Sequence, residues 1–241
     1  MEANPTSLLL HYAYIESEES KGSFEECHRV YNALVERLQA EIERVVAATQ
    51  VEIADALDDK ARYELEEKAR RAAATAADER MHEDGDGDDG EVSEAVRIQE
   101  RESIRAAITE SKAEELNELK RLTANVWIMQ MRFARRAEGV QAARAVFSRA
   151  RKSAHTTWQV FEASAMLELH WNKEQKIATN VFEVGLKRFS DDVGYVVRYL
   201  DFLLSVNDDG SESRDAPYLL LTAYLGDRNS CQTPEPYSRE A

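Results

Sequence analysis

The sequence contains few residues that break helices or turn strands: nine glycines and four prolines among 241 residues. A protein built from many short strands needs a turn about every 8–12 residues, so this scarcity favours long helices. Alanine, Glu, Arg and Leu are abundant, and all four are good helix formers. We therefore expect an all-α protein.

Cysteine is also scarce, with two residues, Cys27 and Cys231, that share no motif spacing. Two isolated thiols suit a reducing compartment better than a disulfide framework. The first twenty residues have neither a basic stretch nor a long apolar core, so we expect no signal peptide. No apolar run approaches the roughly 18 residues of a membrane-spanning helix, and we expect no membrane contact.

Motifs for catalysis and metal binding are lacking as well. The five histidines show no zinc-ligand spacing, and no P-loop, dinucleotide-binding glycine motif or nucleophile elbow is present. The acidic stretch 82–91 fits the first ligand positions of an EF-hand loop, but Asp89 and Ala95 replace the required glycine and glutamate. We predict a protein that is not an enzyme and that has no cofactor or metal.

The strongest positive pattern is a regular spacing of aromatic residues. Trp127, Phe161 and Tyr195 follow one another at intervals of 34 residues, and Phe147 and Phe182 are 35 residues apart. Thirty-four residues is the length of one helix–turn–helix unit in proteins of the TPR class. We expect each ring of the first series to open the first helix of such a unit.

Within a unit, apolar residues recur at helical spacing. Trp127, Met131 and Ala134 share one face of a first helix, and Gly139 separates it from a second. We expect stacked helix pairs throughout 123–206.

Another helix pair is predicted over residues 1–40, where Leu9, Tyr12 and Glu16 mark the first helix and Tyr31 lies in the second. The composition then changes, because residues 41–122 are rich in Glu, Ala and Arg and contain sparse large apolar residues. We predict a charged helical insertion over 41–122 with a disordered acidic loop at 82–91.

Residues 207–241 do not continue the repeat pattern. We expect this part of the chain to be a divergent and mostly disordered tail.

The segment VWIMQMRFARRAEGVQAARAVFSRARK, residues 126–152, resembles the large subunit of the mRNA cleavage stimulation factor, which is built from HAT (half-a-TPR) repeats. This is the suppressor of forked family. Ala143, Arg144 and Phe147 match its second-helix signature, and the run FARRAEG is more specific than the generic repeat. Gln130 departs from the pattern by replacing an aromatic residue, and Cys27-His28 by replacing Ala-Arg.

The resemblance implies a superhelical array of antiparallel HAT/TPR-like helix pairs. It also implies a non-catalytic scaffold in nuclear pre-mRNA 3′-end cleavage and polyadenylation, with the cytoplasm left open as a further location. Implied partners are other cleavage and polyadenylation factor subunits and a second copy of the chain, with RNA contacted indirectly or weakly. The alternative is a HAT-repeat adaptor that contacts RNA directly through its basic repeats.

The residues that match the repeat signature have mostly aromatic or small side chains, which suits packing between helices. Two carboxylates among them resemble family residues that tie helices together, although ordinary surface carboxylates are the alternative. The complete set is Leu9, Tyr12, Glu16, Tyr31, Trp127, Ala143, Arg144, Phe147, Phe161, Glu168, Phe182, Tyr195 and Tyr199.

Charge is distributed unevenly along the chain. The formal net charge is −15, which disfavours extensive binding to phosphate backbones. Residues 125–189 nevertheless contain eleven Lys or Arg against five Asp or Glu. We predict a basic partner surface there, for an acidic protein segment, RNA or the chain's own acidic loop; a solvated helix face is the alternative. It comprises Arg132, Arg135, Arg136, Arg149, Arg151 and Lys152.

Overall fold

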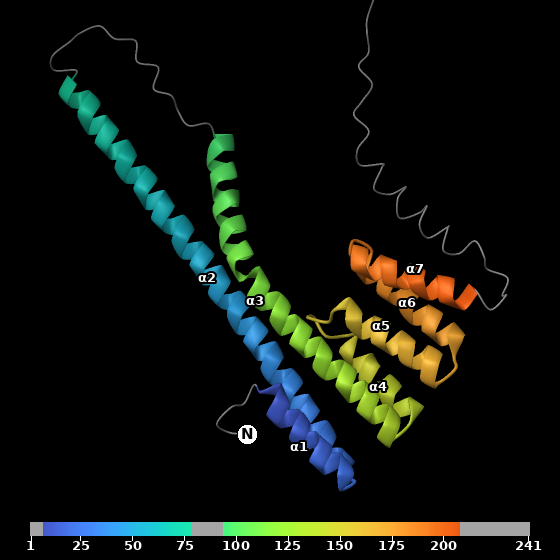
Figure 1. Ribbon diagram of the computed structural model, residues 1–241. Helices are drawn as coiled ribbons and strands as arrows, with labels where there is room; N and C mark the ends of the chain where they lie inside the picture. The colour runs from blue at the N-terminus through green and yellow to red at the C-terminus, as the bar shows by residue number, and fades with distance from the viewer. Residues whose placement is uncertain (1–6, 79–93, 208–241) are drawn as a thin grey trace, which may run out of the picture. The chain divides into compact units, whose positions relative to one another are not determined.

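A computed structural model describes residues 7–78 and 94–207 (Figure 1). Every regular element in these residues is a helix, which confirms the expected all-α class. The predicted acidic loop at 82–91 and all but the first residue of the predicted tail at 207–241 lie outside the described residues. The elements are α1 (Leu8–Ser20), α2 (Phe24–Asp78), α3 (Glu94–Ala137), α4 (Val140–Ala150), α5 (Trp158–Met166), the π-helical turn η1 (Leu167–Trp171), α6 (Gln175–Phe189) and α7 (Val193–Asn207).

The chain divides into two compact units. Among the described residues, the first combines 7–35 with 122–207, and the second lies between Glu36 and Arg121. The predicted insertion, 41–122, begins five residues after the start of this second unit. Both boundaries fall inside helices, because α2 and α3 run through them and contain no glycine or proline that would end a helix.

The expectation that Trp127 opens a helix is wrong. This residue lies in the last third of α3, which begins at Glu94. Phe161 and Tyr195, by contrast, lie in the first turns of α5 and α7. The 34-residue spacing therefore reports the packing position of each ring rather than the start of each helix.

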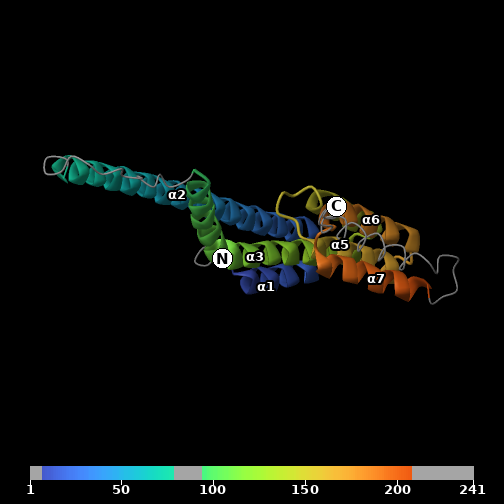
Figure 2. The same ribbon diagram turned by 90° about the horizontal axis from the view of Figure 1, so that it is seen from above.

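In the first unit the later helices stack in chain order. Gly139 has φ 98°, a conformation that favours glycine, and it reverses the chain between α3 and α4. α5 packs against both α4 and α6, and α7 packs against α5 and α6. Figures 1 and 2 both show α5, α6 and α7 side by side. This arrangement is the stack of helix pairs that the sequence predicts.

The core of this stack consists largely of rings. Phe147 meets Phe161 edge to face with ring centroids 5.3 Å apart, and Phe182 stacks on Tyr199 at 5.1 Å. The Tyr195 hydroxyl donates a hydrogen bond of 2.8 Å to the backbone oxygen of Phe182. Such ring pairs stabilise the fold by more than their buried area alone.

The core of the N-terminal helices is also aromatic. The ring of Phe133 contacts that of Tyr31 at 5.8 Å and that of Phe24 at 6.0 Å. Leu9 does not join this core, because its side chain is 78% exposed. The α1 residues that are buried are His11 and Ile15, and Leu9 lies about 200° around the helix from His11.

The second unit consists of α2 from Glu36 to its end and of α3 from its start to Arg121. Its buried α2 residues are Leu38, Ile42, Val45 and Thr49, which are four, three and four residues apart. This is the spacing of a coiled-coil seam. Farther along, an ion pair links Lys60 of α2 to Glu100 of α3. Among the described residues, no helix is both long and apolar enough to cross a bilayer.

Candidate interaction surface

A buried ion pair joins α4 to the helix that follows it. The guanidinium of Arg144 donates two hydrogen bonds of 2.7 Å, one to each carboxylate oxygen of Glu168. Glu168 is only 4% exposed and lies in the π-helical turn η1. Burial alone would raise the pKa of the Glu168 carboxyl, but hydrogen bonds from Arg144 and Asn172 outweigh it, and the pKa is lowered. The carboxylate is therefore held ionised.

Asn172 extends this pair to a third helix. Its amide nitrogen donates to a Glu168 oxygen at 3.0 Å, and its amide oxygen accepts a hydrogen bond of 2.5 Å from Nε of Arg135 on α3. The backbone nitrogen of Asn172 bonds to the oxygen of Leu167, five residues earlier, which closes the π turn. The sequence indicated Arg144 and Glu168 separately but gave no sign that Asn172 and Arg135 complete their network.

A second polar network lies where the sequence departs from the family pattern. Gln130 is fully buried, and its amide nitrogen lies 3.0 Å from Oδ1 of Asn32 and 3.2 Å from Nδ1 of His28. Because this nitrogen donates to His28, Nδ1 is the bare nitrogen of the ring and Nε2 carries the proton. Nε2 then donates to Glu138 at 3.0 Å. His28 and Asn32 thus satisfy the amide nitrogen of the buried glutamine, while its amide oxygen has no hydrogen-bond partner among the described residues.

Three cations of the predicted partner surface contact other residues of the chain. Arg135 bonds to Asn172, and the guanidinium of Arg136 pairs with Glu19 at 2.9 Å. Arg149 donates to Asn32 at 3.1 Å and lies over the ring of Trp127. Half of the set therefore contacts residues of other elements, although Arg136 and Arg149 are themselves exposed. Arg132, Arg151 and Lys152 are exposed as well.

The set comes from two helices, α3 and α4, and the turn after α4. Arg149 lies 5.6 Å from the ring centroid of Trp127. Trp127 precedes Arg136 by nine residues on α3, which corresponds to about 14 Å along a helix. Arg132, Arg135 and Arg136 therefore gather near the end of α3, and Arg149, Arg151 and Lys152 near the end of α4.

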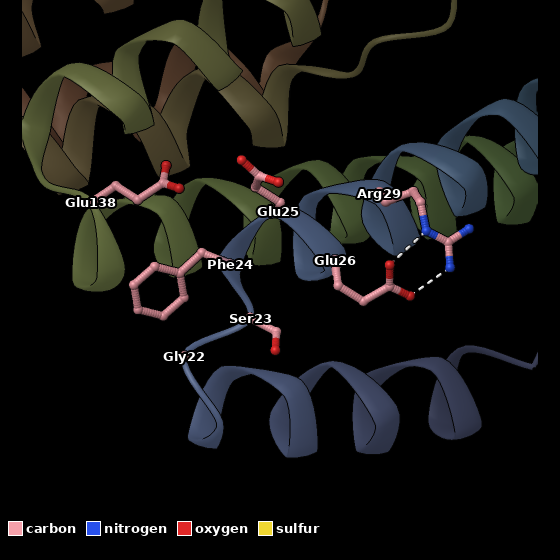
Figure 3. A pocket seen from close by; sticks show the side chains of 7 residues that line it. All are labelled: Gly22, Ser23, Phe24, Glu25, Glu26, Arg29 and Glu138. Atoms are coloured by element: carbon pink, nitrogen blue, oxygen red, sulfur yellow. Dashed lines mark hydrogen bonds and ion pairs between the residues drawn. The ribbon is translucent and has the colours of Figure 1, made fainter.

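A solvent-open hollow lies at the turn between α1 and α2 (Figure 3). Glu25 and Glu138 point toward the same space, while the carboxylate of Glu26 is held by Arg29. The hollow is lined by carboxylates and by the ring of Phe24. It is open to solvent and does not enclose a substrate. Within the described residues, no three His, Cys, Asp or Glu side chains are placed to hold a metal ion.

Most of the predicted packing residues lie at helix contacts. Eleven of the thirteen are buried or half-buried: Tyr12, Tyr31, Trp127, Ala143, Arg144, Phe147, Phe161, Glu168, Phe182, Tyr195 and Tyr199. Arg144 is half-buried against Glu168. Glu16 is exposed on α1, and Glu19, one turn later, is the carboxylate that pairs with α3.

Comparison with known proteins connects this arrangement to one family. The family described as Suppressor of forked protein (Suf) matches residues 1–214. The mRNA 3′-end-processing protein RNA14 of Cryptococcus neoformans is 43% identical over 212 residues, which is 88% of this chain and 19% of the fungal protein. That alignment is too long to omit Glu36–Arg121, so the second unit is part of the likeness.

Shorter matches reach an animal and a plant. Protein suppressor of forked of Drosophila melanogaster is 41% identical over 86 residues, covering 36% of this chain and 11% of the fly protein. Cleavage stimulation factor subunit 77 of Arabidopsis thaliana is 48% identical over 82 residues, covering 34% of this chain and 11% of the plant protein. The chain thus spans about a fifth or less of the length of these relatives.

Proposed function

The chain belongs to the suppressor of forked family, and from that premise we propose that it is part of a non-catalytic scaffold for pre-mRNA 3′-end processing in the nucleus. Its partners in this proposal are other subunits of the cleavage and polyadenylation machinery. The observation that carries the proposal is the stack of helix pairs joined by the buried Arg144–Glu168 ion pair.

Stacked helix pairs suit this role for a physical reason. Each pair buries its apolar stripe only against its neighbours, so the stack behaves as one continuous body. The outer faces of successive helices then form an extended surface on which a partner can lie. The buried rings and the Arg144–Glu168 pair fix the angle between successive pairs, and with it the shape of that surface.

Direct RNA binding through the basic repeats is less well supported. Phosphate binding gains strength from many cations in series. Here three of the six cations, Arg135, Arg136 and Arg149, contact other residues of the chain. We therefore favour protein partners, with RNA contacted indirectly.

Self-association forms part of the proposal. Val193, Val197 and Leu204 of α7 are all about half exposed, and their spacing of four and seven residues places them on one helix face. An apolar stripe of this kind suits contact with a further helix. Sedimentation of the 241-residue chain over a range of concentrations tests whether that helix comes from a second copy.

Recovery of partners from nuclear extract tests the main proposal. The tagged chain is incubated with extract treated with ribonuclease, and the bound proteins are identified. We expect cleavage and polyadenylation factors to be enriched. An Arg151→Glu/Lys152→Glu variant should recover the same factors if the chain contacts them directly rather than through RNA. Binding that disappears with ribonuclease would support the RNA alternative, and recovery of no processing factor would contradict the proposal.

A further inference from the structure

The turn between α5 and α6 exposes an indole ring. Trp171, the last residue of η1, is 64% exposed, whereas Trp127 is 6% exposed and Trp158 is half-buried. Single exposed aliphatic residues are ordinary on protein surfaces, but tryptophan is strongly enriched at the energetic centres of protein interfaces. The ring is therefore a candidate for contact with a partner.

The backbone beneath this ring is fixed on both sides. Asn172 closes the π turn and bonds through its side chain to Glu168 and Arg135. Lys173 has φ 59°, a left-handed conformation that is uncommon outside glycine. The turn is held by a bond of 2.9 Å from the backbone nitrogen of Glu174 to the oxygen of Glu168. Trp171 is thus displayed on a rigid support, which lowers the entropy lost on binding.

A few cations lie in this turn and on the neighbouring helix α3. Lys173 and Lys176 are exposed in the same turn and in the first turn of α6, and Glu174 is the exposed acid between them. Arg135 reaches the turn through Asn172, and Arg132 lies three residues earlier on α3, on the same helix face. The remaining acid of the turn, Glu168, is buried and neutralised by Arg144.

We propose that Trp171, with Lys173 in the same turn and Arg132 on the neighbouring helix α3, anchors a docking site for an acidic peptide segment that carries an apolar residue. The site rests on the proposed function and specifies a partner surface for it. The indole supplies an apolar contact at the centre, and the cations supply charge complementarity at the rim. RNA fits less well, because few cations adjoin the ring and the chain as a whole carries a formal charge of −15.

Binding of defined probes to the whole 241-residue chain tests this site. The probes are an array of 12-residue peptides rich in Asp and Glu with one central Phe or Leu, matching peptides with Ser at the centre, matching peptides with Lys in place of the acids, and an oligouridylate of the same length. We expect binding to the acidic peptides with an apolar centre and weaker binding to each of the other three.

Variants of the chain localise the binding. Trp171→Ala should weaken it about tenfold or more, as loss of an interface centre does. Arg132→Glu should weaken it and reduce its dependence on salt. The matched controls are Leu204→Ala, which removes an exposed apolar side chain from α7, and Arg151→Glu, which reverses a charge near the end of α4; neither should change binding.

Two results would overturn the docking site: binding of the acidic peptides that Trp171→Ala leaves unchanged, and stronger binding to oligouridylate than to any peptide. Absence of binding to every probe would also count against it. These outcomes are separate from the proposed function, because recovery of processing factors from nuclear extract by a Trp171→Ala chain would leave the scaffold intact and remove this site alone.

Discussion

The carboxylate of Glu168 is placed where an unpaired charge would be costly. Its side chain is 5% exposed, that of Arg144 is 32% exposed, and their two hydrogen bonds are parallel. Removing one member of a buried pair leaves the other desolvated and unsatisfied. The same contact links α4 to η1, so it contributes both to stability and to the arrangement of the stack.

Replacing the arginine should therefore destabilise the chain. We expect Arg144→Ala to lower the free energy of unfolding by about 3 kcal/mol, measured by chemical denaturation. Arg198→Ala is the control, because the Arg198–Glu162 pair spans 3.5 Å with the arginine side chain 57% exposed, and such pairs contribute about 1 kcal/mol or less. Equal losses for the two variants would show that the buried pair has no special role.

The pair should also leave a signature in the pH dependence of stability. The pKa of Glu168 is lowered below the ordinary 4.5 in the folded state, so its stabilisation is complete above 4.5 and is lost as pH falls through the folded-state pKa. Glu168→Gln removes this titration. The difference in unfolding free energy between wild type and variant should be constant from pH 5 to 7 and shrink below 4.5, whereas a difference that grows on acidification would reverse the assigned sign.

A glycine in α6 is required by its neighbour. A Cβ added at Gly185 would lie 2.0 Å from the hydroxyl oxygen of Tyr195 and 2.6 Å from the adjoining ring carbon. We expect Gly185→Ala to destabilise the chain by about 2 kcal/mol despite the better helix propensity of alanine, as overpacking does. Gly194→Ala, where the nearest atoms are 3.0 Å or more away, is the control for measurement by thermal unfolding. A stabilised Gly185→Ala chain would contradict this packing.

At the scale of elements, the sequence predicted helix pairs where turn residues are clear. Gly139 between α3 and α4 is such a case, and its left-handed backbone explains why a glycine is needed there. The start of the helix containing Trp127 could not be predicted from ring spacing, because that spacing records which residues face a neighbour. The sequence did indicate a continuous helix in one way, because residues 94–137 contain no glycine or proline.

The sequence predicted that the second unit is helical, but it did not predict which residues of α2 are buried. Buried residues recur on α2 at coiled-coil spacing from Leu38 to Thr49, within a segment whose composition looks mostly polar. We expect Ile42→Ala, at a fully buried position, to lower thermal stability by the equivalent of about 2–4 kcal/mol. Val51→Ala, at a position 60% exposed, should change it little. Comparable effects of the two would argue against the seam.

The residue types of the candidate site were predictable from the sequence, but their contacts were not. Sequence pattern identified the cations and the signature residues, since residue type and helical spacing determine both. It could not show that Arg135, Arg136 and Arg149 contact other residues of the chain, because those partners are 37 or 117 positions away in sequence. Nor could it show that Trp171 is exposed while Phe161 is buried, since both are aromatic residues of the same helical segment.

At the scale of the whole molecule, family membership and the stack lead to the same role. The chain matches 19% of the length of its Cryptococcus relative, so it corresponds to one portion of such a protein. Within that portion, the described residues build a stack of helix pairs. The scaffold role that we propose therefore depends on the integrity of the stack rather than on any single reactive side chain.

The most direct test of that dependence compares the processing factors recovered from nuclear extract by the wild-type chain and by Arg144→Ala, at a temperature where the variant has lost its cooperative fold. We predict that the wild-type chain enriches cleavage and polyadenylation factors and that the variant loses them, while Arg198→Ala retains them. Equal recovery by all three chains would contradict the claim that stacked helix pairs form the binding surface.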